Sequence, residues 1–203
     1  MTAKKRAAIL ISGRGSNMRA LIEAAAAPDY PAQIVLVFSN VEDAAGLDFA
    51  RAHGIDTVAV SHKTFATRAA FDAFVDAQLE LHKVELVCLA GYMRILSDAF
   101  ARTWEGRMLN IHPSLLPLFP GTHVHEQVLA AGATTSGCTV HFVVPELDAG
   151  PTIAQAQVPV LAGDTPETLG ARVLAQEHAL YPAALAMLAD GKVAMRDGHA
   201  VFV

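Results

Sequence analysis

Short apolar runs alternate with longer alanine-rich segments along most of this chain, and that alternation limits the folds it can adopt. Four apolar runs have the length of strands, over residues 7–12, 34–39, 56–60 and 86–90. Three segments between them show helical spacing of apolar residues, over residues 18–27, 44–53 and 67–82. Strands that alternate with helices build βαβ units, in which helices cover the faces of a parallel sheet. We therefore expect an α/β fold with a doubly wound, mostly parallel sheet and flanking helices.

After residue 107 the pattern changes. Residues 108–112 predict a short strand, and a proline-rich loop follows over residues 113–121. Residues 139–144 and 152–160 predict two more strands. A loop with several prolines inside such a chain is typical of a segment that carries function.

The C-terminal part begins with a clear helix start. The Thr165 hydroxyl can cap a first turn, and Pro166 fits the first helical position. We expect this helix to run to about residue 188. Asp197 and Gly198 are the residues that a type I′ turn requires, so residues 192–203 predict a hairpin.

Composition restricts the function. The chain has 203 residues and is 53% hydrophobic, which fits a single domain over residues 1–203. Its 15 Lys and Arg against 20 Asp and Glu give a net charge of −5, and no basic block favours nucleic acid. The apolar run after Arg6 is too short for a signal sequence, so we expect a cytoplasmic protein with no membrane partner. Cys88 and Cys138 lie outside any C-x-x-C motif and predict buried, inert thiols.

A glycine-rich segment lies where the first strand should end and the first helix begin. It reads Ser12-Gly13-Arg14-Gly15-Ser16-Asn17. Glycines let a ligand approach the backbone, and a helix start offers free N–H groups, so the segment favours a phosphate. It is neither the dinucleotide fingerprint, since Met18 replaces the third glycine, nor a Walker loop. Alone, it is equally consistent with a plain tight turn.

Two further segments have residues suited to proton transfer. Asn110 and His112 lie on the same side of a predicted strand, where an amide can stabilise an oxyanion and an imidazole can exchange a proton. Glu146 and Asp148 lie in a predicted turn, where one carboxylate can face that imidazole and favour its charged form. The alternatives are a buried structural histidine and a solvated acidic turn.

Five motifs together resemble a known family. They are Ser12 to Asn17, Gly91-Tyr92-Met93-Arg94-Ile95-Leu96, Asn110-Ile111-His112-Pro113-Ser114, Asp148-Ala149-Gly150-Pro151 and Gln176-Glu177-His178. In order and spacing the chain resembles the phosphoribosylglycinamide formyltransferases, which are folate-dependent enzymes of purine synthesis. The Asn-x-His and Asp-x-Gly-Pro motifs also occur in methionyl-tRNA formyltransferase and formyltetrahydrofolate deformylase. The other motifs, residues 120–125 and the single-domain length distinguish the glycinamide enzymes.

The resemblance implies transfer of the formyl group of 10-formyltetrahydrofolate to the amine of phosphoribosylglycinamide. It implies a phosphate-binding part over about residues 1–105 and a folate-binding, catalytic part over about residues 106–203. The implied catalytic residues are Asn110, His112 and Asp148. Those implied for the phosphorylated substrate are Gly15, Ser16, Asn17 and Glu177. Those implied for folate are Arg68, Met93, Arg94, Ile95, Leu96, Asn110, Val144, Pro145, Glu146, Leu147 and Asp148.

In the implied reaction the amine attacks the formyl carbon, and Asn110 and protonated His112 stabilise the charge on oxygen. Asp148 favours the protonated imidazole and orders either a water or the imidazole. No metal is implied, and the partners are small molecules, with the chain a monomer or homodimer. The chain departs from the family pattern at Leu118, Thr122 and Val124, which affects loop contacts rather than chemistry.

Three alternatives stay open. A hydrolase could use the same three residues on water and release formate. A metal hydrolase could draw ligands from His112, His123, His125, His141 and Asp148. A non-catalytic sensor of a phosphorylated metabolite could use the glycine-rich segment alone, although it leaves the pairing of Asn110 and His112 unexplained.

Overall fold

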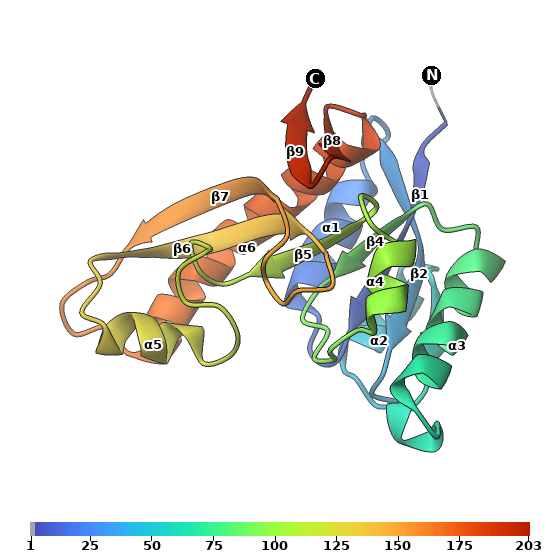
Figure 1. Ribbon diagram of the computed structural model, residues 1–203, viewed down its shortest axis with the longest axis horizontal. Coiled ribbons are helices and arrows are strands. Elements are labelled where there is room, and N and C mark those ends of the chain that lie inside the picture. Colours follow the sequence, from blue (N-terminus) through green and yellow to red (C-terminus); the bar gives the residue numbers. More distant parts are fainter. Residues whose placement is uncertain (1–2) are drawn as a thin grey trace.

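A computed structural model describes residues 3–203, and a seven-stranded sheet runs through it (Figure 1). The strands are β1 (Lys5–Ile11), β2 (Ala32–Ser39), β3 (Asp56–Ala59), β4 (Leu86–Leu89), β5 (Met108–His112), β6 (Thr135–Phe142) and β7 (Thr152–Pro159). Their order is β3-β2-β1-β4-β5-β6-β7. The strands from β1 to β5 pair in parallel, whereas β6 and β7 run antiparallel to their neighbours. The expected mostly parallel sheet is confirmed.

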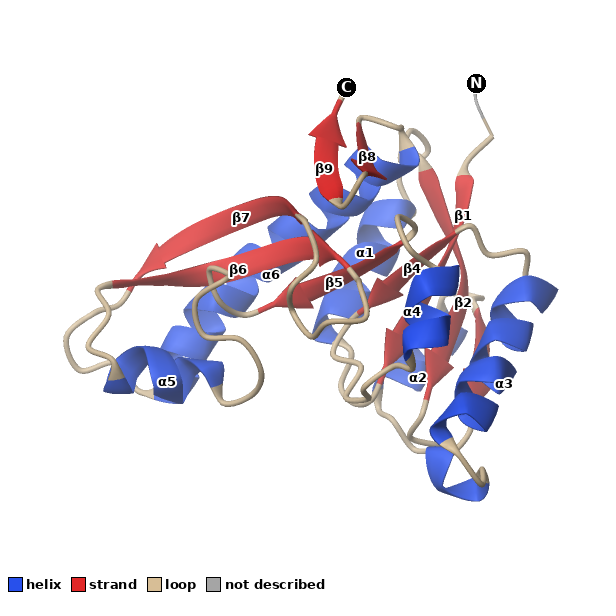
Figure 2. Ribbon diagram, viewed as in Figure 1, coloured by secondary structure: helices blue, strands red, loops and turns tan. Residues whose placement is uncertain are grey.

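Helices cover both faces of this sheet (Figure 2). They are α1 (Ser16–Ala25), α2 (Gly46–Ala52), α3 (Arg68–Leu81), α4 (Asp98–Thr103), α5 (Val124–Ala130) and α6 (Pro166–Ala189), with a 3₁₀ turn, η1 (His62–Thr64). Alternate β1 side chains enter opposite cores: Ile9 packs with α1, α2 and α6, whereas Leu10 packs with α3 and α4. The sheet is therefore doubly wound, and its inner strands are buried on both faces.

The far ends of β6 and β7 extend beyond the parallel strands and carry α5 (Figure 1). Val128 of α5 and Val173 of α6 pack with Cys138 and Val158 of these strands in a third apolar cluster. A Cβ at Gly137 would lie 2.0 Å from the carbonyl oxygen of Ala156, so this close strand pairing requires glycine. The extension positions the proline-rich loop and the residues that follow it.

Local sequence signals set several element ends as predicted. Thr165 caps α6 through a capping box with Thr168, and Pro166 begins the helix. Asp197 (φ 49°) and Gly198 (φ 74°) form the tight turn between β8 (Val193–Arg196) and β9 (His199–Phe202), which confirms the C-terminal hairpin. The first helix begins two residues earlier than predicted, at Ser16.

Two short helices and η1 were not predicted. α4 has six residues and α5 has seven, too few for an apolar period to emerge. The serine before α4 was a usable signal, because the Ser97 hydroxyl accepts a bond from the Phe100 N–H. No comparable cap precedes α5. The residue before this helix, His123, has a left-handed backbone conformation and makes no capping bond through its side chain.

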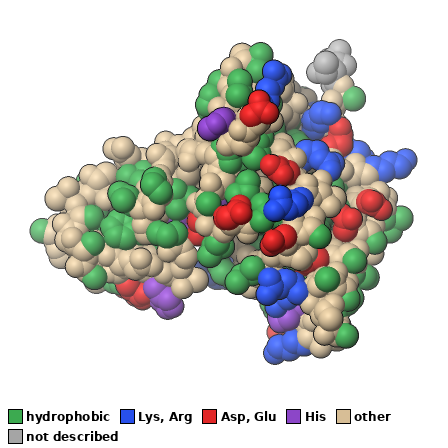
Figure 3. All heavy atoms as spheres, in the orientation of Figure 1, with side chains coloured by type: hydrophobic (Ala, Val, Ile, Leu, Met, Phe, Trp, Pro, Cys, Tyr) green, Lys and Arg blue, Asp and Glu red, His purple; other side chains and the backbone are tan. Residues whose placement is uncertain are grey.

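The surface and the thiols agree with the composition. On the face drawn in Figure 3, Lys and Arg side chains lie among Asp and Glu rather than in one basic patch. Within residues 3–203, no helix has both the length and the apolar character needed to cross a membrane. Cys88 and Cys138 are both free and buried, and burial raises the pKa of each thiol to about 12.

Candidate active site

The glycine-rich segment forms the connection between β1 and α1. Gly15 takes a left-handed conformation (φ 70°) directly before the helix, and a Cβ there would lie 3.0 Å from Met18 Cε and 3.4 Å from Gly46 Cα. The first helical N–H to be paired is that of Arg19, which donates to the Gly15 carbonyl. The preceding N–H groups of Ser16 and Asn17 therefore stand at the positive end of α1, beside an open hollow.

Asn17 and Glu177 meet although 160 residues separate them in the chain. The Asn17 amide donates to Glu177 Oε2 at 2.6 Å, and both residues are buried. Burial raises the pKa of the Glu177 carboxyl, and the bond from Asn17 opposes part of that shift. Asn17 Oδ1 is buried and has no partner among residues 3–203. Two residues implied for the phosphorylated substrate thus form one polar contact, and Asn17 Oδ1 remains available to accept a hydrogen bond from a ligand.

Strand β5 places Asn110 and His112 on one side, as predicted. His112 is buried, and its Nδ1 lies 3.5 Å from Asp148 Oδ2. Its Nε2 lies 2.9 Å from the Phe119 carbonyl oxygen. Both ring nitrogens therefore face oxygen atoms, an arrangement in which an imidazolium can donate to both. The structure brings the three implied catalytic residues together.

The proline-rich loop reaches both members of the His112–Asp148 pair. The Phe119 carbonyl faces the imidazole, and the Gly121 N–H donates to Asp148 Oδ2 at 2.9 Å. Phe119 itself has a φ of 53°, which is uncommon for a bulky residue. Asp148 Oδ2 is thus used by the imidazole and the loop, whereas Oδ1 lies 4.0 Å from His141 Nε2 and can take further partners.

His141 belongs to the same cluster, although its sequence position suggested only a possible metal ligand. It lies opposite Asn110 in the antiparallel pairing of β5 and β6. His141 Nδ1 lies 2.8 Å from the Phe142 carbonyl and so bears the ring proton, leaving Nε2 to accept from the Asn110 amide at 3.1 Å. Burial lowers the pKa of His141, which keeps this acceptor available.

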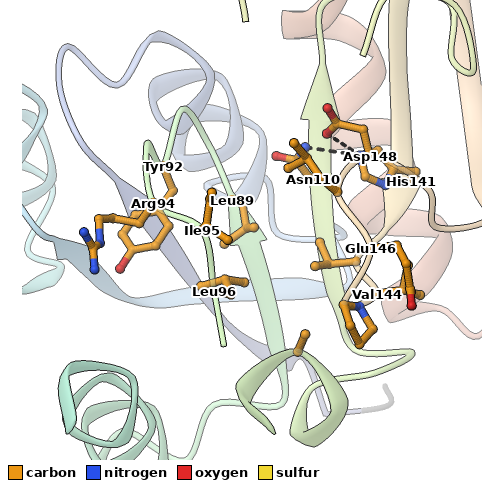
Figure 4. A pocket seen from close by; sticks show the side chains of 14 residues that line it. Leu89, Tyr92, Arg94, Ile95, Leu96, Asn110, His141, Val144, Glu146 and Asp148 are labelled. Atoms are coloured by element: carbon orange, nitrogen blue, oxygen red, sulfur yellow. Dashed lines mark hydrogen bonds and ion pairs between the residues drawn. The ribbon is translucent and has the colours of Figure 1, made fainter. Parts of the chain in front are cut away.

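One pocket has two facing walls that end at this cluster (Figure 4). The first wall includes Leu89, Tyr92, Arg94, Ile95, Leu96 and Ala101. The second includes Asn110, His141 and the run Val143, Val144, Pro145, Glu146, Leu147 and Asp148. Asn110, His141 and Asp148 lie together at one end of the pocket. Most residues implied for folate therefore share one cavity, although its walls come from both sides of residue 105.

Two residues implied for folate lie outside this lining. Met93 is 74% exposed and borders the hollow beside the glycine-rich segment, together with Gly91. Arg68 is exposed at the first position of α3. The side chains of residues 92–96 thus divide between two cavities, which helical or strand patterns could not reveal because the segment is a loop.

The three departures from the family pattern lie around the loop. Leu118 is 58% exposed, and Val124 is buried in the α5 cluster. The Thr122 carbonyl accepts a bond from the Gln127 side chain. None of the three belongs to the residues that line the pocket. Across residues 3–203, no group of three or more His, Cys, Asp or Glu side chains is arranged to hold a metal ion.

Comparison with known proteins agrees with this geometry. The family model described as formyl transferase matches residues 5–185. The chain is 46% identical over 192 residues to phosphoribosylglycinamide formyltransferase of Escherichia coli, covering 95% of this chain and 91% of that protein. It is 54% identical over 194 residues to the trifunctional purine biosynthetic protein adenosine-3 of Bos taurus. That match covers 96% of this chain but only 19% of the longer relative.

A solved structure supports the same assignment. The glycinamide ribonucleotide transformylase 1 of Symbiobacterium toebii superposes with a TM-score of 0.96 at 41% identity. The superposition covers 100% of this chain and 96% of that one. Fold, site and sequence agree over nearly the whole length, and the chain belongs to the formyl transferase family.

Proposed function

We propose that this chain transfers the formyl group of 10-formyltetrahydrofolate to the amine of 5-phosphoribosylglycinamide, a step of purine biosynthesis. The observation that carries the proposal is the position of the catalytic cluster. Asn110, His141 and Asp148 lie at one end of the pocket whose walls are the implied folate segments. Glu177, bonded to Asn17 of the glycine-rich segment, is near enough to His112 for their charges to interact.

The pocket fits a folate. Leu89, Leu96 and Val143 offer apolar surface for a flat ring. Tyr92 Oη and Arg94 Nε are buried polar atoms with no partner among residues 3–203, and a polar ligand could satisfy them. When bound, the folate supplies an activated formyl group on its N10 nitrogen. Backbone N–H groups of the glycine-rich segment would hold the phosphate of the other substrate.

Asn110 stabilises the developing negative charge on the formyl oxygen. One hydrogen of its Nδ2 is held by His141, which leaves the second to be donated into the pocket. His141 thereby fixes which end of the amide faces the substrate. Neutral His141 accepts from the amide nitrogen only, so the donor orientation is the favoured one.

His112 and Asp148 move the protons. The amine forms a bond to the formyl carbon and gives up one proton, while the bond from that carbon to N10 breaks and N10 gains one. His112 would supply the proton to N10 through Nε2 once that atom leaves the Phe119 carbonyl, while Asp148 keeps the imidazole oriented through Nδ1. Asp148 Oδ1, which the loop does not use, can hold a water that accepts the proton from the amine.

The proposal includes a cytoplasmic location and a single catalytic unit, as a monomer or homodimer. Its partners are the two small substrates rather than nucleic acid or membrane. The phosphate would be bound by residues of the first 105 positions. Catalysis and most folate contacts would come from later residues, with Glu177 reaching back to Asn17.

The test is a turnover assay. The protein is incubated with 10-formyltetrahydrofolate, with and without phosphoribosylglycinamide, and the folate absorbance is followed. Turnover only when the amine is present is the expected result. Equal turnover without the amine, accompanied by formate, would replace transfer by hydrolysis. The His112→Ala variant, checked for folding, shows whether the activity belongs to this site.

A further inference from the structure

Ser12 joins the two cavities through a single hydroxyl. It stands directly after β1, at the start of the glycine-rich segment. Its Oγ donates to Asn40 Oδ1 at 2.5 Å and accepts from the Met93 N–H at 2.7 Å. Its own N–H donates to the Gly91 carbonyl at 3.2 Å. The glycine-rich segment is therefore tied to the segment that walls the folate pocket.

That second segment depends on few bonds for its position. Residues 90–97 connect β4 to α4 without regular secondary structure, and Gly91 takes a φ of 72°. At its far end the Ser97 N–H donates to the buried Asp72 carboxylate at 2.7 Å. Near its beginning the bonds to Ser12 perform the same task. Removing the hydroxyl would release the Met93 N–H, while the backbone bonds of Ser12 to Gly91 and of Ala90 to Leu10 would still hold the preceding residues.

The two cavities meet at this segment. Met93 borders the hollow beside Gly15, whereas its neighbours Tyr92 and Arg94 line the folate pocket. A ligand in the hollow would face both segments that the Ser12 hydroxyl joins, because residues 12–17 and residues 90, 91 and 93 line it. A ligand that orders a shared segment lowers the entropy that a second ligand must lose on binding, and the two then bind cooperatively.

We propose that Ser12 is a positioning residue that couples the phosphorylated-substrate site to the folate site through its bond to the Met93 N–H. Each substrate then binds more tightly when the other site is filled. The inference rests on the proposed function, because it takes the hollow and the pocket to be the sites of the two substrates.

Binding measured without turnover tests the coupling. Titration calorimetry gives the Kd of phosphoribosylglycinamide and of 5,10-dideazatetrahydrofolate, which carries no formyl group, each alone and with the other present. In the wild type we expect each ligand to lower the Kd of the other by about fivefold or more, and linkage requires the factor to be the same in both directions. Ser12→Ala should reduce this factor to about twofold or less, and Ser12→Thr, which keeps the hydroxyl, should restore part of it.

Ser39→Ala is the matched control. It removes another buried hydroxyl from the same edge of the sheet, but within residues 3–203 that hydroxyl bonds only to the backbone of Val41, two residues along the chain. The control should retain the wild-type factor. An unchanged factor in folded Ser12→Ala, or no coupling in the wild type, would overturn the proposal. Failure of either ligand to bind the wild type would overturn the proposed function as well, so the two failures are distinct.

Discussion

A double-variant cycle on His112 and Asp148 tests whether they act as one unit. His112→Ala removes general acid–base catalysis, for which we expect a loss of ~10²–10⁴-fold in kcat. Asp148→Asn removes the charge 3.5 Å from His112 Nδ1 while keeping an oxygen for the Gly121 N–H. Hydrogen bonds to charged groups contribute about 1.5–3 kcal/mol. The His112–Asp148 contact is an ion pair at 3.5 Å rather than a short hydrogen bond, so we expect the lower end of this range, or about tenfold.

The two hypotheses then differ by a measurable amount. If Asp148 acts only through the imidazole, the double variant should be about as slow as His112→Ala alone, because the group that the carboxylate orients is gone. If they act independently, the losses multiply and the double variant is about tenfold slower still, or about 1.4 kcal/mol. Single-turnover rates at one pH, with folding confirmed by circular dichroism, separate these outcomes.

Glu146→Gln is the matched control for this cycle. It removes another carboxylate from the same turn and the same pocket lining. Glu146 makes no ion pair with His112 in the described residues, so its effect should multiply with that of His112→Ala. If the losses at His112 and Asp148 also multiply, Asp148 does not act through the imidazole and its assignment to a unit with His112 is wrong.

Three further predictions address the remaining parts of the site. Gly15→Val should weaken the binding of phosphoribosylglycinamide at least tenfold more than the binding of a folate analogue, because the position is left-handed and crowded by Met18. Equal losses of affinity, measured by calorimetry, would contradict the phosphate assignment. Ile95→Asp should abolish antifolate binding while the phosphorylated substrate still binds, with Leu81→Asp as the exposed control; retained antifolate affinity would place the pterin elsewhere. Glu177→Gln should raise the melting temperature at every pH above about 4.3, the pKa of the unfolded carboxyl. Burial raises the pKa of Glu177, so the folded wild type loses stability as pH rises from there through the raised value. The difference between the two melting curves should vanish at lower pH, and a constant difference at every pH would refute the reasoning.

Features with a local cause could be predicted from the sequence. The βαβ order follows from spacing of apolar residues, and the start of α6 follows from Thr165 and Pro166, whose cap forms within one turn. The hairpin turn follows from Asp197 and Gly198, which accept positive φ. Asn110 and His112 share a side because strand side chains alternate. These signals act over a few residues, so the chain carries them before it folds.

Features that depend on distant residues were decided only by the tertiary structure. The antiparallel register of β5 and β6 places His141 against Asn110, and no local pattern encodes that register. The Asn17 amide meets Glu177 across 160 residues, while the Ser12 hydroxyl reaches the Met93 N–H across 81. Met93 borders the hollow rather than the folate pocket. The sequence could not predict this, because a loop has no regular period that sets the direction of a side chain. The sequence determined which residue types are present at the site, and chain packing determined which of their atoms meet.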